Sequence, residues 1–105
     1  MTYKRIITER ADELIDACIG YILFTLKNPG AALHLLDGIE ALYSRLEENP
    51  FQFPECKDAF LSQRGYHEAL VSDMHYKLVF RIDTNTVFVV GLFHDLEDYE
   101  AKVNG

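Results

Sequence analysis

The side chains best suited to chemistry in this 105-residue chain are Lys77, Arg81 and His94, in its last third. Lys77 and Arg81 stand four residues apart in a segment where apolar and polar residues alternate, so both fall on one face of the expected strand. His94 directly follows the next strand-like segment. Two cations and an imidazole are part of what metal-free phosphodiester cleavage needs, because the reaction requires stabilisation of a charged transition state and a proton donor.

The same three residues also have a purely structural interpretation. Glu68, Asp73 and Asp83 are near enough to pair with Lys77 and Arg81 across the expected sheet. A His at a strand end can simply bond to the backbone. The dense Lys cluster that would hold RNA phosphates is also missing, since the preceding loop offers only two cations among several carboxylates. The sequence alone leaves both interpretations open.

The overall charge disfavours a polyanionic partner. The chain has 17 acidic and 10 basic residues, a net charge of −7, whereas nucleic-acid binding draws most of its affinity from neutralised phosphates. With 49% hydrophobic residues, a chain of this length can bury one core, so we expect a single domain over residues 1–105. The longest apolar segment, residues 19–26, is far shorter than the roughly 18 residues of a membrane span. Because the N-terminus also lacks an export signal, we expect a cytoplasmic protein.

The cysteines and histidines give no sign of a cofactor. Cys18 and Cys56 do not form a disulfide framework, and neither has another Cys or His at ligand spacing. His34, His67 and His75 are spaced just as irregularly. We therefore expect no metal site, no cofactor and no redox role for either cysteine.

The elements that must position these residues divide into a helical first half and a strand-rich second half. Residues 3–7 predict a short, charged edge strand. A first helix follows to about Lys27, and Asn28 and Pro29 begin a second that extends to about Glu48. The short link between them predicts an antiparallel hairpin. The apolar stripe expected on the first helix comprises Leu14, Ala17, Cys18, Tyr21, Ile22 and Thr25.

Three strand-like segments follow a proline-bearing loop, at residues 66–71, 75–83 and 86–93. In the middle segment Tyr76, Leu78, Phe80 and Ile82 face one way, and Lys77, Val79 and Arg81 face the other. The expected fold class is therefore α+β. It has a short N-terminal strand, an antiparallel helical hairpin, a three-stranded antiparallel meander and a short C-terminal helix or tail, with the helices packed on one face of the sheet.

Several short motifs add to this order of elements: Tyr21 with Ile22, Asn28 with Pro29, Ala31 with Ala32, residues 76–82, and His94 followed by Asp98 and Tyr99. Together they resemble the RelE/ParE superfamily of toxins from bacterial type II toxin–antitoxin modules, over nearly the whole chain. The ending of the chain places it closer to the ParE, or plasmid stabilisation, branch, although Glu97 stands where that branch usually has a basic residue.

The resemblance implies a growth-inhibiting toxin that is neutralised by a cognate antitoxin wrapping its helices and sheet. ParE-like members poison DNA gyrase without a recognised catalytic centre, so a ParE-like toxin that binds gyrase is the leading expectation. The first alternative is a RelE-like endoribonuclease that cuts mRNA on the ribosome with Lys77, Arg81 and His94 as catalytic residues. The second is a degenerate homologue that binds an antitoxin but is not toxic.

The expected contact surface for target or antitoxin is the sheet face turned away from the helices, together with its edge. Because Tyr is enriched at protein interfaces, two tyrosines are included among the expected contact residues. The expected interface residues are Tyr66, Lys77, Val79, Arg81, His94 and Tyr99.

Overall fold

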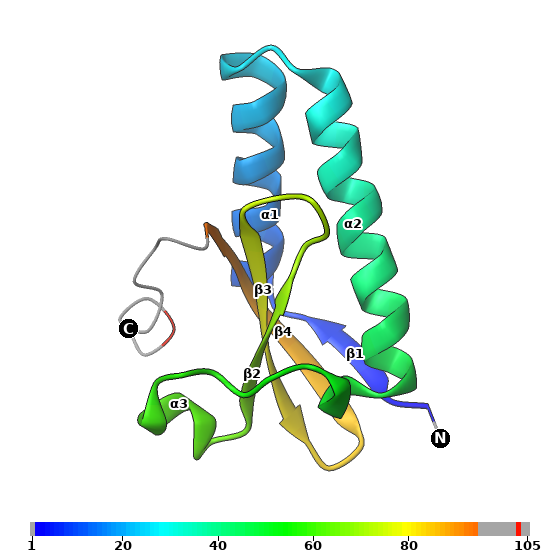
Figure 1. Ribbon diagram of the computed structural model, residues 1–105, viewed down its shortest axis with the longest axis vertical. Coiled ribbons are helices and arrows are strands. Elements are labelled where there is room, and N and C mark those ends of the chain that lie inside the picture. Colours follow the sequence, from blue (N-terminus) through cyan, green and yellow to red (C-terminus); the bar gives the residue numbers. More distant parts are fainter. Residues whose placement is uncertain (1, 95–102, 104–105) are drawn as a thin grey trace.

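The computed structural model describes residues 2–94 and 103 of the chain. A helical hairpin lies against a four-stranded sheet whose strand order is β1-β4-β3-β2 (Figure 1). This arrangement confirms the predicted α+β fold with a helical hairpin packed against the sheet. The expected C-terminal helix or tail falls almost wholly outside the described residues.

Local capping chemistry sets the start of both long helices. Helix α1 (Glu9–Gly20) begins after Thr8, whose hydroxyl accepts a hydrogen bond from the backbone N–H of Ala11 at 3.1 Å. Helix α2 (Pro29–Glu48) begins after Asn28, whose side chain caps it in the same way. Pro at the first helical position costs nothing, because its missing N–H would have no partner there. The two helices lie side by side and run in opposite directions in Figure 1, which confirms the predicted hairpin.

Helix α1 continues into the π-helical turn η1 (Tyr21–Thr25). The stripe expected on this helix was only partly right, because Ala17, Tyr21 and Thr25 are exposed. Apolar residues recur at helical spacing along two neighbouring lines of this helix, and the line that begins at Ala11 faces the core. Its buried members are Ala11, Ile15 and Ile22.

Three strands form the predicted antiparallel meander: β2 (Tyr66–Leu70), β3 (Tyr76–Asp83) and β4 (Thr86–His94). The edge strand β1 (Lys4–Ile7) pairs with β4 in parallel, a pairing that the sequence patterns do not specify. Parallel neighbours need a long crossover connection, which the hairpin and the rest of the chain supply here.

The main core lies between the hairpin and the sheet. Leu78 and Phe80 of β3 are fully buried there, and Tyr76 and Ile82 pack against its margin, which confirms the predicted alternation. On α2 the core stripe includes Leu35, fully buried and facing the sheet. No described helix has both the length and the apolar character to cross a membrane.

The segment between α2 and β2 reaches the other side of the sheet. It contains the 3-10 turn η2 (Pro50–Gln52) and the short helix α3 (Ala59–Ser62), which lies apart from the hairpin in Figure 1. Leu61 of α3 and Cys56 are buried in a second, smaller apolar cluster. This segment therefore covers part of the face that was expected to be free.

Candidate functional site

The strand register brings several of the predicted site residues together on one face of the sheet. Tyr66 of β2 lies opposite Arg81 of β3, and Leu70 lies opposite Lys77. Side chains of directly paired residues point to the same face, so Tyr66, Lys77 and Arg81 share the face opposite the main core. We call these residues, with Glu68, the sheet face.

Lys77 is held by a carboxylate on this face. Its ammonium nitrogen lies 3.6 Å from a carboxylate oxygen of Glu68, and the two side chains are only 21% and 11% exposed. An ion pair that is mostly shielded from water is screened less than a surface pair. Lys77 is therefore engaged within the protein.

Arg81 is also engaged, though closer to solvent. Its guanidinium nitrogen Nη1 lies 3.5 Å from Asp83 Oδ2, and its guanidinium carbon lies 4.6 Å from the centre of the Phe88 ring. Phe88 comes from the neighbouring strand β4, directly opposite Arg81 in the register. These contacts match the structural interpretation of Lys77 and Arg81 given above.

Val79 was expected to be a surface contact, but it is a core residue. It is fully buried, in the same cluster as Cys56, Leu61 and Phe93. The alternation placed its side chain on the correct face, but the α3 segment and Leu14 of α1 cover that part of the face. The sequence pattern cannot show a cover that comes from a distant loop.

His94 lies on the opposite face from Lys77 and Arg81. In the register it pairs with Tyr76, whose side chain packs against the main core, and the two ring centres are 5.7 Å apart. His75 is also close, with 6.2 Å between the imidazole centres. A β-bulge between Val79 and Phe80 shifts the register and so decides which face His94 takes.

The three residues of the possible ribonuclease set therefore do not converge. Lys77 and Arg81 lie four residues apart on one strand, about 13 Å at the usual rise of a strand, and His94 extends from the other face. Tyr99 and Glu97 lie outside the described residues. Among the described residues, no group of three His, Cys, Asp or Glu side chains is placed to hold a metal ion.

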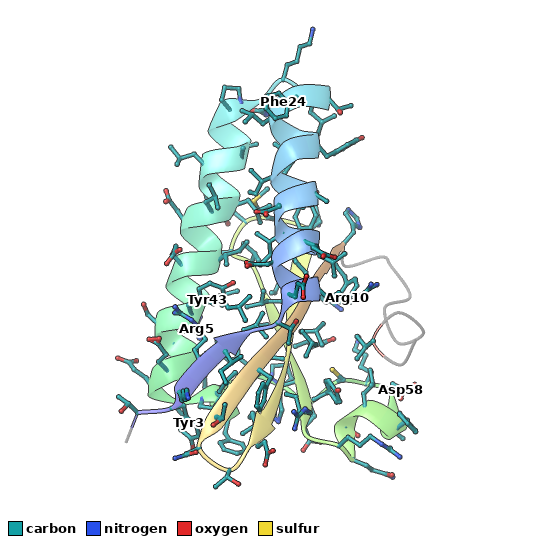
Figure 2. All side chains as sticks on the ribbon, turned by 180° about the vertical axis from the view of Figure 1, so that it is seen from behind. Tyr3, Arg5, Arg10, Phe24, Tyr43 and Asp58 are labelled. Carbon is teal, nitrogen blue, oxygen red and sulfur yellow. The ribbon has the colours of Figure 1, made fainter. Side chains whose placement is uncertain are left out.

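The sequence patterns missed an anchor between β1 and α2. The guanidinium of Arg5 lies 4.5 Å above the ring of Tyr43 and 3.1 Å from a carboxylate oxygen of Glu47 (Figure 2). Burial raises the pKa of Tyr43 to about 12, Arg5 opposes this rise, and the carboxylates of Asp12 and Glu40 add to it. A Lys-Arg pair in an edge strand was the only available signal, and it indicated exposure rather than this contact.

The patterns also missed exposed apolar side chains at the far end of the hairpin. Phe24 is 74% exposed, and Leu33 on α2 is 59% exposed. Figure 2 places Phe24 at the tip, well away from the sheet. The available signal was the unbroken apolar segment at residues 21–24, which has more large side chains than one helical stripe can bury.

Two comparisons with solved structures show that this fold is shared with known toxin–antitoxin systems. The chain superposes on a chain of the chromosomal ParDE system from P. aeruginosa with a TM-score of 0.70, at 15% identity, over 89% of this chain and 96% of that one. For a chain of the RelBE2 toxin–antitoxin complex from Mycobacterium tuberculosis the TM-score is 0.59, at 18% identity, over 90% and 99%. No curated protein sequence matches significantly.

A family model gives the more specific result. The model for the ParE toxin of the type II toxin–antitoxin system parDE matches residues 5–99, which covers the hairpin, the sheet except Lys4, and the start of the C-terminal segment. The match agrees with the order of elements and with the resemblance read from the sequence. The chain therefore belongs to the ParE toxin family of type II toxin–antitoxin systems.

Proposed function

We propose that this chain is a single toxin domain that arrests bacterial growth by binding a protein target in the cytoplasm, with DNA gyrase as the target inferred from the family. A cognate antitoxin neutralises it. The family match supports the toxin assignment, and the similar solved structures come from toxin–antitoxin systems, which supports an antitoxin partner. Tyr66, Lys77 and Arg81 are candidate contacts for one of these proteins.

The main observation in favour of a binding mechanism is that the candidate catalytic residues lie apart from one another. Lys77 and Arg81 are each within ion-pair distance of a carboxylate, and His94 lies on the other face of the sheet. Cleavage of RNA needs cations and a proton donor directed at the same phosphate. The net charge of −7 adds a general repulsion of RNA. The endoribonuclease alternative is thus less well supported than binding to a protein.

The decisive test expresses the lone gene from a tightly controlled promoter in a bacterial host. We expect growth arrest, and loss of supercoiling activity when the purified chain is added to gyrase. The matched control is a Lys77→Met/Arg81→Gln variant, which removes the cations that an endoribonuclease would need. Because gyrase binding requires no catalytic cation, this variant should still inhibit supercoiling, at a higher concentration if Lys77 and Arg81 contact gyrase, whereas an endoribonuclease would lose its cleavage activity.

Other results would assign the chain differently. Codon-positioned mRNA cuts in a translating extract, lost in the same variant, would show the RelE-like activity. A folded chain that causes no arrest but still binds the antitoxin encoded beside it would show a degenerate homologue. Either result would overturn the proposed gyrase mechanism.

A further inference from the structure

Two of the four histidines come together at one end of the sheet, although nineteen positions separate them in the sequence. His94 is the last residue of β4, and His75 directly precedes β3. In Figure 1 the turn that leads into β3 and the end of β4 lie at the same end of the sheet. The spacing of histidines along the chain could not indicate this pair, because the antiparallel pairing of β3 with β4 creates it.

The two imidazole rings are almost close enough to share a metal ion. Their ring centres lie 6.2 Å apart, and the ring planes differ by 35°. An ion bonded to one nitrogen of each ring, at about 2.0 to 2.1 Å, would lie about 3.2 Å from each ring centre. Tetrahedral coordination then places the two ring centres about 5 Å apart. The rings therefore need to approach each other by about 1 Å to bind one ion.

One ring of the pair is packed in place, and the other has room to adjust. His94 is half-buried, and the Tyr76 ring lies edge-on to it, with 5.7 Å between the ring centres. His75 is exposed and lies outside β3, so its side chain can rotate between staggered conformations without disturbing the strand pairing. Rotation of the His75 side chain can therefore supply the missing approach.

Two imidazole ligands select the kind of ion that the pair can bind. Imidazole nitrogen suits Zn²⁺, Cu²⁺ and Ni²⁺, whereas Mg²⁺ and Ca²⁺ take oxygen ligands. The pair offers two protein ligands, in keeping with the absence of any metal-binding group of three His, Cys, Asp or Glu within residues 2–94 and 103. Water would complete the coordination, so the affinity should be lower than that of a closed structural site with four protein ligands.

We propose that His75 and His94 form a two-ligand site for a divalent transition-metal ion such as Zn²⁺. A bound ion would join the start of β3 to the end of β4, at the opposite end of this strand pair from the turn at residues 84–85. Because the two rings are brought together only in the folded chain, binding would stabilise the fold. The inference concerns a property of the folded chain and does not depend on the proposed function, so each can fail without the other.

Metal titrations of the purified, tag-free full chain test the inference. The probe is ZnCl₂ in isothermal titration calorimetry at neutral pH, and MgCl₂ is the hard-cation control. We expect saturable binding of one Zn²⁺ per chain and no binding of Mg²⁺. In NMR spectra the imidazole signals of His75 and His94 should shift as Zn²⁺ is added. The signals of His67 should not, because its ring is buried and its Nδ1 lies 3.0 Å from the carbonyl oxygen of Phe53.

Variants of the chain locate the ion. His75→Ala and His94→Ala should each weaken Zn²⁺ binding by about tenfold or more, since only one imidazole of the pair remains. The matched control is His34→Ala, which removes an exposed histidine of α2 and should bind like the unmodified chain. Saturating Zn²⁺ should raise the melting temperature of the unmodified chain by about 5 °C, and that of His75→Ala far less. Because His75 is exposed, His75→Ala keeps the core intact and tests the site even if His94→Ala does not fold.

Four results would overturn the inference. The first is the absence of saturable Zn²⁺ binding by the folded chain. Equal binding by the unmodified chain and by His75→Ala would show that the ion binds elsewhere. Loss of binding in His34→Ala would move the site to α2. Imidazole shifts at only one of the two paired histidines would show a single-ligand contact rather than a shared site.

Discussion

The sheet face and the end of the helical hairpin are both partly exposed, but their side chains differ in the contacts that they make within the chain. We call the exposed large apolar side chains at the end of the hairpin the hairpin patch: Tyr21, Leu23, Phe24, Leu26, Leu33 and Leu36. On the sheet face Lys77 pairs with Glu68 and Arg81 pairs with Asp83, and the α3 segment covers Val79 between them. On the hairpin patch Leu33 remains 59% exposed. The charged side chains of the sheet face are thus paired within the chain, whereas the chain leaves much of the apolar area of the patch exposed to solvent.

The comparison predicts that neighbouring leucines on α2 differ strongly in their contribution to stability. Leu35→Ala removes a fully buried side chain and should lower the free energy of unfolding by about 3 kcal/mol. Leu33→Ala removes a side chain that is 59% exposed and should change it by less than about 0.5 kcal/mol. Urea denaturation followed by circular dichroism measures both. Similar losses in the two variants would mean that the patch takes part in folding.

A second prediction concerns the part of α2 that packs on the sheet. A Cβ atom at Gly38 would lie 2.6 Å from Cγ1 of Val71, which is fully buried and therefore has little room to move. Gly38→Ala should lower the free energy of unfolding by about 1 to 2 kcal/mol, because overpacking outweighs the better helix propensity of Ala. The measurement is a thermal melt. A gain in stability would show that α2 lies farther from the β2–β3 turn.

The third prediction separates the two ion pairs of the sheet face. A double-mutant cycle with Lys77→Met and Glu68→Gln should give a coupling free energy of about 1 kcal/mol, because the pair is largely shielded from water. The matched cycle with Arg81→Gln and Asp83→Asn should give less than about 0.5 kcal/mol, since Asp83 is 61% exposed. Equal coupling in the two cycles would contradict the difference in shielding.

Local chemistry made much of the fold predictable from the sequence. The side chains of Thr8 and Asn28 cap their helices by accepting a hydrogen bond from the backbone N–H three residues later. A few consecutive residues are therefore enough to predict each helix start. The alternation at residues 76–82 identified the core side of β3 for the same reason. These features need no information about distant parts of the chain.

The candidate site was less predictable because it depends on long-range packing. The bulge beside Val79 decides the face of His94, yet the nearly continuous apolar sequence of β4 hides any alternation. The cover over Val79 comes from Leu61, eighteen positions earlier in the chain. The exposure of the hairpin patch depends on where the sheet ends, which no helix pattern encodes.

The smallest predicted effect concerns Gly20, at the junction between α1 and the π-helical turn near the patch. A Cβ atom there would meet nothing within 4 Å, and the residue has ordinary helical backbone angles, with φ of −60° and ψ of −41°. Gly20→Ala should therefore raise the free energy of unfolding by about 0.5 to 1 kcal/mol, because Ala loses less backbone entropy in a helix. A thermal melt compares this gain with the loss expected for Gly38→Ala. A loss at Gly20 would mean that the π-helical turn needs glycine. Opposite signs at the two glycines would confirm that α2 is tightly packed at Gly38 and that the chain leaves room beside Gly20.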